Sequence, residues 1–478
     1  MKLSGKIALF LLICGMLFSA AACGKGTAET AAQTGTPAAD TVAAEPEAAE
    51  IVLAEKGGKT EFKLVYDVES THALRYNILQ IREAFDKKLD VDLRPLDDFQ
   101  DEIPCEIIVG SQRREACKVL TDGLSSGEYI IKAVTTAAGN TQIVIAYKGA
   151  YARMEAIDRF ITEYITDEKC AVPADLEVKG TCKEVNAVIT TSIPQLRDPC
   201  IVEADGVYYA YGTGWRCWKN TTGSLKGGWQ DIGVVAQDPP NVAGDRWAPE
   251  VHYYNGAYYM FTTYRSSLNE HRGCTIMKSE TPEGPFVEIT NGHITPDTWD
   301  AIDGTFYVDE EGQPWMIFVH EWTSTDDKIG RMAAAKLSDD LTEFVSEPIE
   351  LFRADDPSWS KNGVTDGCWM YKCETGELLM IWSNWDSAGY CVGIARSDNG
   401  KVDGKWSQDK PLLYSKAMTD TWDGGHGMIF TDKKGQMYLS VHSPNSGTDT
   451  RKETPVFVPI KERDGTLVWD LWSASDDD

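Results

Sequence analysis

The sequence predicts a mainly β protein, a five-bladed β-propeller preceded by a small α/β domain. Three observations support this fold class. A hairpin pattern occurs five times in the C-terminal part of the chain, all 15 tryptophans lie in that part, and the segment before it alternates between strand and helix patterns. A chain of 478 residues is long enough to hold both domains.

The five repeats share one pattern. Each opens with a polar residue, continues as a short apolar strand, turns through a segment with glycine, and returns as a second apolar or aromatic strand. Turns such as "ADGV" and "YNGA" are two-residue hairpin signals. A spacing of roughly 50 to 60 residues with several strands per repeat is typical of propeller blades, so region 190–478 is predicted to hold five blades. The repeats open at Asp198, Glu250, Asp303, Asp366 and His426.

Region 51–185 is predicted to be the small α/β domain. Apolar residues have helical spacing over 73–89 and 151–165, and strand patterns cover 105–110, 127–134 and 141–149. The stretch "EIIVGSQRREACKVL" and the strand–helix pair that follows resemble the small domain preceding the catalytic barrel in family 20 β-hexosaminidases and in α-glucuronidases. That resemblance implies a carbohydrate setting and a spacer or packing role without catalysis.

The first 50 residues predict export. Residues 1–23 combine Lys2 and Lys6 with a short apolar run and end in "SAAAC" at Cys23, which resembles a bacterial lipobox although alanine replaces the commoner leucine. An ordinary secretory signal is the alternative. Residues 24–50 contain no aromatic side chain and are predicted to be a disordered linker. We therefore expect an extracytoplasmic, cell-surface lipoprotein, attached to the membrane only through a lipid on Cys23.

Composition narrows the partners. The formal charge of -28, from 46 basic and 74 acidic residues, repels phosphate backbones, so we expect no nucleic-acid partner, whereas a neutral sugar is unaffected. We expect a monomer. The ten cysteines beyond the signal show no disulfide framework and no CxxC metal pattern. Pairs such as Cys105 with Cys117 or Cys170 with Cys182, and buried free thiols, both remain open.

Propeller geometry gives the opening residues of the repeats a common location. The innermost strand of each blade lines the central axis, so equivalent positions of successive inner strands converge at one end. Four carboxylates and a histidine would then surround one cavity, where burial pushes pKa values apart. An aspartate before a strand is, taken singly, a turn or cap residue. The repetition favours a functional site instead.

The repeats resemble the five-bladed catalytic domain of glycoside hydrolase family 43, a family of inverting arabinofuranosidases, arabinanases and xylosidases. The motifs that carry this resemblance are "LRDPCIVEADGVYYAYGT", "RWAPEVHYYNGAYYMF", "AIDGTFYVDEEGQPWMIF" and "GGHGMIF". It implies that Asp198 is the general base and that Asp303 tunes the pKa of the acid and orients it. It also places Trp247 and Glu250 near the sugar. His426 would face an axial water or a metal.

The general acid is where the sequence departs from this pattern. The fourth motif usually has glutamate before Gly-Pro, but here it is "TDGCW", which makes Asp366 the candidate acid. Its pKa is expected to be raised by neighbouring carboxylates, Asp303 first. Glu321, at the end of a strand in "VHEW", is the reserve candidate, or else a rim residue. An inverting pair must stand about 6.5–9.5 Å apart to admit water.

The sequence therefore predicts an inverting glycoside hydrolase acting on pentose-containing plant-type polysaccharides or oligosaccharides, of the α-L-arabinofuranosidase, arabinanase or β-xylosidase type. No cofactor is expected to be required. A structural Ca²⁺ near His426, and a hydrogen-bonded histidine without metal, are left as alternatives, and no HExxH motif is present. The alternative function is a non-catalytic, glycan-binding surface lipoprotein on a degenerate propeller, which the altered fourth motif favours.

Overall fold

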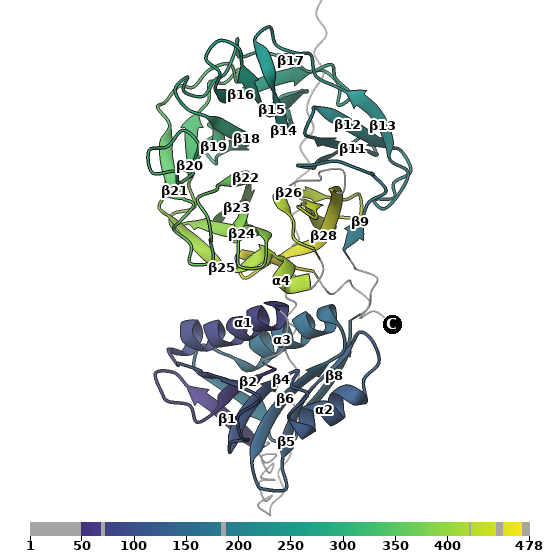
Figure 1. Ribbon diagram of the computed structural model, residues 1–478, viewed down its shortest axis with the longest axis vertical. Coiled ribbons are helices and arrows are strands. Elements are labelled where there is room, and N and C mark those ends of the chain that lie inside the picture. Colours follow the sequence, from purple (N-terminus) through teal and green to yellow (C-terminus); the bar gives the residue numbers. More distant parts are fainter. Residues whose placement is uncertain (1–48, 68–71, 183–187, 420–421, 446–452, 471–478) are drawn as a thin grey trace, which may run out of the picture. The chain divides into compact units, whose positions relative to one another are not determined.

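The computed structural model describes residues 49–67, 72–182, 188–419, 422–445 and 453–470. The predicted signal peptide, Cys23 and linker residues 24–48 lie outside these ranges. The described chain is mostly strand and contains an α/β domain followed by a five-bladed β-propeller, which confirms the predicted fold class (Figure 1). No helix within the described ranges is long and apolar enough to cross a bilayer.

The α/β domain is built on a six-stranded sheet with the order β3-β2-β4-β6-β5-β8, in which β3, β2, β4 and β6 are parallel. Buried aliphatic side chains cover both faces of its central strands. The predicted helices and strands coincide with α1, β4, β5, β6 and α3, while the domain's resemblance to hexosaminidase small domains stays a prediction. The elements are β1 (Glu50–Glu55), β2 (Lys63–Tyr66), α1 (His72–Leu89), β3 (Pro95–Asp97), β4 (Cys105–Val109), α2 (Glu115–Asp122), β5 (Glu128–Thr135), β6 (Thr141–Tyr147), α3 (Ala150–Tyr164), β7 (Lys169–Pro173), which pairs with β1, and β8 (Glu177–Thr181).

Each blade of the propeller is an antiparallel four-stranded sheet whose strands follow one another in sequence. The five inner strands are β10 (Cys200–Ala204), β14 (Val242–Tyr254), β18 (Ala301–Val308), β22 (Asp366–Lys372) and β26 (Gly425–Thr431). The second strands are β11 (Val207–Gly212), β15 (Ala257–Ser266), β19 (Pro314–His320), β23 (Leu378–Trp385) and β27 (Met437–Ser443). The outer strands are β12 (Arg216–Asn220), β13 (Gln230–Val234), β16 (Arg272–Ser279), β17 (Val287–Glu288), β20 (Arg331–Lys336), β21 (Ile349–Arg353), β24 (Tyr390–Ser397), β25 (Trp406–Tyr414), β28 (Thr454–Arg463) and β29 (Thr466–Trp469).

The blades form a closed ring (Figure 1). Each inner strand contacts the next, and β26 of the last blade contacts β10 of the first. A short strand ahead of the first blade, β9 (Ile189–Thr190), pairs with β28 in the last blade, and helix α4 (Lys416–Thr419) connects blades 4 and 5. Apolar side chains of neighbouring blades pack against each other, as Phe261 and Met316 do between blades 2 and 3. This packing fixes the inner strands around one axis.

Every blade has a residue with left-handed backbone on or just before its inner strand, near the strand's start in blades 1, 3, 4 and 5 and within β14 in blade 2. The φ values are 57° at Asp198, 39° at Ala248, 56° at Asp303, 32° at Gly367 and 53° at His426. In blades 2 to 5 the pairing register with the second strand shifts at this point, which is the mark of a β-bulge. A bulge redirects the side chain that it carries. The side chains at these positions therefore point in a different direction from those of the regular strand residues.

Four of these left-handed residues are held by the same kind of hydrogen bond. The backbone N–H donates to a side chain at the end of the second strand of the preceding blade, so each bulge is fixed by the neighbouring sheet. The pairs are Asp198 with His442 Nδ1 at 3.3 Å, Ala248 with Thr213 Oγ1 at 3.1 Å, Asp303 with Thr263 Oγ1 at 3.0 Å, and His426 with Ser383 Oγ at 2.8 Å.

None of the ten cysteines in the described ranges forms a disulfide. The sequence left two alternatives, disulfide pairs and free thiols. The structure shows free thiols at the four positions that were considered for pairing: Cys105, Cys117, Cys170 and Cys182. Burial raises the pKa of Cys117 and of Cys170 to about 12, so these thiols stay protonated.

Candidate active site

Three carboxylates and one imidazole meet at one end of the propeller axis. His426 Nδ1 lies 3.3 Å from Asp198 Oδ1, 3.5 Å from Asp366 Oδ1 and 3.9 Å from Asp303 Oδ2. The four residues come from blades 5, 1, 4 and 3, and their side chains are almost entirely removed from solvent. We call these four residues the axial cluster. The structure thus brings together four of the five residues that open the predicted repeats.

Asp198 is held as a carboxylate. Burial alone would raise its pKa, but the positive charges of His426 and Arg197 outweigh burial, and the pKa of Asp198 lies below its usual value. Arg197 Nε is 3.5 Å from Asp198 Oδ1, and the Thr213 hydroxyl donates a hydrogen bond to Oδ2. An ionised carboxylate fixed in this way can accept a proton from water.

Asp303 and Asp366 share one proton. Burial and the charge of Asp366 raise the pKa of Asp303 well above its usual value. Burial also opposes ionisation of Asp366, but the hydrogen bonds with His426 and Asp303 outweigh it and hold the pKa of Asp366 below its usual value. Tyr390 adds a donor, with Oη 2.7 Å from Asp366 Oδ2. Two adjacent carboxyl groups in a buried site cannot both ionise at low cost, so their pKa values are pushed apart and Asp303 is the easier of the two to protonate.

The sequence predicted that Asp303 would raise the pKa of Asp366. The pKa of Asp366 is lowered instead, and the pKa of Asp303 is the one that is raised. The reason is the number of donors that each carboxyl group receives. Asp366 accepts from Tyr390 Oη, from Gly367 N at 3.1 Å and from the His426 ring, whereas Gly367 N also reaches Asp303 Oδ2 at 3.0 Å. The donors at Asp366 stabilise its charged form, and the proton moves to the neighbour.

His426 supplies the positive charge at the centre of the cluster. Burial favours the neutral ring, but the charges of Asp198 and Asp303 outweigh burial and raise the pKa of His426 to about 10. Ligand atoms of Asp303, Asp366 and His426 lie within 4.8 Å of one another, which is close enough to surround a cation. Ca²⁺ prefers six to eight oxygen ligands, so these three side chains would supply only part of its shell, and the His426 ring could bind a metal only in its neutral form.

Glu250 lies next to the axial cluster, close to the inner strands of blades 1 and 4, since its charge adds to the burial that raises the pKa of Cys200 and of Cys368. Its carboxylate Oε1 lies 2.6 Å from His252 Nε2 and accepts a hydrogen bond from the Thr305 hydroxyl. The left-handed residue of blade 2 is Ala248, so Ala248 is the structural equivalent of Asp198 and Asp303. The prediction aligned the repeats by their polar residues, whereas the bulge places Glu250 two residues further along its strand.

Trp247 and Glu321 meet around Arg272, at the same end of the propeller. Arg272 donates from Nε to Glu321 Oε2 at 2.7 Å and from Nη2 to Oε1 at 2.9 Å, and its guanidinium carbon lies 5.2 Å from the centre of the Trp247 ring. Burial raises the pKa of Glu321. Because Arg272 engages both of its oxygens, Glu321 is arranged as an ion-pair partner.

Three residues around the cluster were missed from the sequence: Arg197, Tyr390 and His442. Arg197 directly precedes the base in the motif, which was an available signal. Tyr390 and His442 lie on β24 and β27, outside the inner strands, and nothing in the sequence marks them. The His442 ring is fully buried, and burial lowers its pKa to about 4, so it is neutral and its Nδ1 can accept from Asp198 N.

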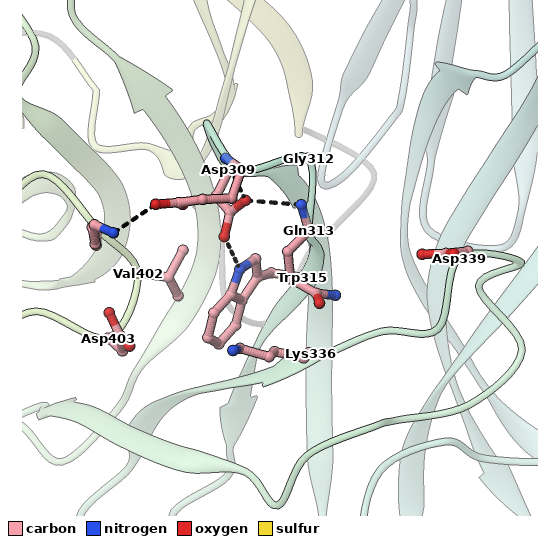
Figure 2. A pocket seen from close by; sticks show the side chains of 10 residues that line it. Asp309, Gly312, Gln313, Trp315, Lys336, Asp339, Val402 and Asp403 are labelled. Atoms are coloured by element: carbon pink, nitrogen blue, oxygen red, sulfur yellow. Dashed lines mark hydrogen bonds and ion pairs between the residues drawn. The ribbon is translucent and has the colours of Figure 1, made fainter.

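A separate cavity of about 450 Å³ lies at the other end of the β18–β19 hairpin, between turns of blades 3 and 4 (Figure 2). Trp315 in its wall is already engaged, since Nε1 donates to Asp309 Oδ2 at 2.8 Å and Lys336 Nζ lies 5.2 Å from the ring centre. Asp303 stands near the start of β18, whereas Asp309 follows its end. The cavity is therefore not part of the axial cluster.

The five-bladed ring and the pairing of an ionised carboxylate with a proton-bearing pair define a β-propeller glycoside hydrolase. The chain belongs to the glycosyl hydrolases family 43, whose family model matches residues 186–467. The motifs in which the sequence resembles this family thus lie within a match that spans the whole propeller.

Individual relatives are similar over the same region. The probable arabinan endo-1,5-alpha-L-arabinosidase A of Aspergillus flavus is 25% identical over 259 residues, which cover 52% of this chain and 74% of the relative. An extracellular exo-alpha-(1->5)-L-arabinofuranosidase of Cellvibrio japonicus is 30% identical over 219 residues, covering 43% of this chain and 60% of the relative. Among solved structures, an endo-arabinase from Bacteroides thetaiotaomicron is 37% identical with a TM-score of 0.51, covering 58% of this chain and 98% of that one.

Proposed function

We propose that the protein is an inverting glycoside hydrolase that cleaves pentose-containing plant-type polysaccharides or their oligosaccharides, of the arabinanase, α-L-arabinofuranosidase or β-xylosidase type. The observation that carries this proposal is the axial cluster, in which ionised Asp198 and the proton-bearing pair of Asp303 and Asp366 surround one imidazolium. The similarity to enzymes named for arabinan supports the arabinose-directed types first.

In the proposed reaction Asp198 takes a proton from a water molecule as the water oxygen attacks the anomeric carbon. The bond between that carbon and the glycosidic oxygen breaks, and the leaving oxygen receives a proton from Asp366. Asp303 supplies that proton to Asp366 through their shared hydrogen bond, so the pair ends with one proton fewer and Asp198 with one more.

The distances to His426 set an upper limit on the separation of the two carboxyl groups. Asp198 Oδ1 and Asp366 Oδ1 lie 3.3 Å and 3.5 Å from the same nitrogen, so their separation cannot exceed the sum of these distances. This limit falls at the lower end of the ~6.5–9.5 Å typical of inverting pairs. The limit applies to the oxygens nearest His426, and the other two oxygens are held by the hydroxyl groups of Thr213 and Tyr390.

We also propose that the mature protein is a surface lipoprotein anchored through Cys23. Two relatives are named as extracellular enzymes, which supports export. The change Cys23→Ser should move the protein from the membrane fraction to the soluble extracytoplasmic fraction and abolish incorporation of labelled fatty acid. Unchanged membrane association and labelling would contradict the anchor.

A substrate panel tests the proposed activity. Purified protein would be incubated with aryl α-L-arabinofuranosides, aryl β-D-xylosides, linear arabinan and xylan, and early products would be followed by NMR. We expect turnover of at least one pentoside, with the first product anomer inverted. A retained anomer would contradict the mechanism. Binding of arabinan or xylan in an affinity gel, without turnover of any substrate, would instead support the alternative function of a glycan-binding protein.

A further inference from the structure

We propose that Trp422 is a stacking platform for a sugar ring of the polysaccharide, beyond the two units joined by the scissile bond. This inference rests on the proposed function and extends it to the recognition of a polymer. Trp422 is 63% exposed. In the described part of the propeller it is the one aromatic side chain among the exposed large apolar residues at the catalytic end, since Tyr253, equally exposed, lies beside the β14–β15 turn at the other end.

The position of Trp422 links it to the axial cluster. It precedes β26 by three residues, and His426 lies at the start of that strand. The adjoining Asp423 accepts a hydrogen bond at Oδ2 from Tyr390 N at 3.3 Å, and the hydroxyl of the same tyrosine donates to Asp366 Oδ2. The segment with Trp422 is thus hydrogen-bonded to Tyr390, and Tyr390 in turn holds Asp366, the candidate acid.

The same segment is held firmly, although the Trp422 ring is left in solvent. Tyr414 Oη donates to the Trp422 carbonyl at 3.3 Å, and Ser443 Oγ donates to the Asp423 carbonyl at 2.8 Å. Asp423 Oδ1 accepts from Asn445 N at 3.1 Å. A ring presented by a fixed backbone loses little conformational entropy when a ligand covers it.

The chemistry of the ligand follows from the indole. A flat aromatic face binds the apolar C–H face of a neutral sugar ring, and the net charge of -28 does not oppose a neutral chain. Core packing does not require this residue, because most of the ring is exposed. An aryl glycoside carries a single sugar, whereas a polysaccharide chain offers further sugar rings that a platform beyond the cleaved bond can stack on.

The test compares Trp422→Ala, Trp422→Phe and the matched control Tyr253→Ala. We measure kcat/KM on linear arabinan or xylan, whichever the wild type cleaves, and on the corresponding 4-nitrophenyl glycoside. Trp422→Ala should lose roughly 10-fold more on the polymer than on the aryl glycoside, mainly through KM, and Trp422→Phe should recover most of the loss. Tyr253→Ala should match the wild type on both substrates.

Equal losses on the two substrates, or no loss on the polymer, would overturn the platform. Affinity electrophoresis in gels containing arabinan or xylan gives a second readout that does not need turnover. Retardation of the wild type and Tyr253→Ala, reduced in Trp422→Ala, would support the platform even if the proposed hydrolysis fails. Equal migration of Trp422→Ala and the wild type in both gels would overturn it even if hydrolysis is found.

Discussion

Asp366 and Asp303 show how strongly the protonation of a carboxyl group depends on its donors. Both are buried beside the same imidazolium, yet their pKa values move in opposite directions. The His426 ring and the Tyr390 hydroxyl donate to Asp366 and lower its pKa, whereas Gly367 N is shared between the two carboxyl groups. The sequence identified the two carboxyl groups but not which of them has the higher pKa. That difference depends in part on Tyr390, which reaches the site from β24 rather than from an inner strand.

The acid assignment predicts a selective kinetic loss. Asp366→Ala should lose roughly 10²- to 10⁴-fold on natural leaving groups and far less on a dinitrophenyl glycoside, whose leaving group departs without a proton. Glu321→Ala should lose to a similar extent on both, since it removes the two-oxygen partner that holds Arg272 beside Trp247. Steady-state kinetics on matched substrates provide the measurement. The assignment is wrong if Glu321→Ala shows the selective loss and Asp366→Ala does not.

The raised pKa of His426 leads us to predict how the stability of the fold changes above pH 7. Its pKa is raised to about 10 in the folded state, from about 6.5 when unfolded. The resulting stabilisation is complete below the unfolded value and is lost as the pH rises through the folded value. Thermal melts from pH 7 to pH 10.5 should therefore fall more steeply for the wild type than for His426→Gln. Parallel curves for the two proteins would rule out the charged ring.

At the scale of the element, the sequence showed the hairpins but not the bulges. Alternating apolar residues and Gly-containing turns made the five repeats visible, since these features are local. The left-handed residue on or just before each inner strand depends on a hydrogen bond from the neighbouring blade, as between Asp303 and Thr263. Such a contact cannot be read along one strand. The sequence pattern therefore aligned Glu250 with Asp198 and Asp303, whereas Ala248 holds the equivalent backbone position.

Gly367 tests the bulge of blade 4. Its φ is 32°, and a Cβ there would lie 2.7 Å from His426 Cγ and 2.9 Å from His426 Cα. Gly367→Ala should therefore displace His426, lower the melting temperature and reduce kcat roughly 100-fold or more, since small misplacements in a site are costly.

The matched control is Gly376→Ala, at the far end of the same blade. Gly376 has φ 104°, and no atom lies within 4 Å of the position that an added methyl group would occupy, so the change costs only backbone strain of ~1–2 kcal/mol. It should lower the melting temperature slightly and leave kcat at the wild-type value. A Gly367→Ala variant no worse than this control would show that the bulge is not needed to position His426.

At the scale of the whole molecule, ring closure is what converts five repeats into one site. Asp198 and His426 are far apart in sequence, and they meet because β26 contacts β10 and β9 pairs with β28. Repeat spacing predicted this convergence, because equivalent positions in a propeller face one axis. Charge balance within the cluster could not be predicted, since it depends on Arg197 and on the exact distances around the imidazole.

The same charge balance predicts indifference to divalent cations. Because the positive charges of protonated His426 and of Arg197 already lie beside the carboxylates, addition of Ca²⁺ or EDTA should shift the melting temperature by no more than the shift seen with a salt control of equal ionic strength. Differential scanning calorimetry at pH 7 measures this. Stabilisation by Ca²⁺ that EDTA reverses would show that a cation occupies the cluster and that His426 is neutral when it binds.

Turnover by Asp198→Asn is the most direct test of the account. Water must be activated whatever the leaving group, so the loss should be about 10³-fold on both a dinitrophenyl pentoside and the polysaccharide. Asparagine has nearly the same size as aspartate, so the fold should persist. Retardation of the variant equal to that of the wild type in a gel containing the polysaccharide would show that binding is retained. The account predicts this equal loss on both substrates. Near wild-type turnover of either substrate would contradict it.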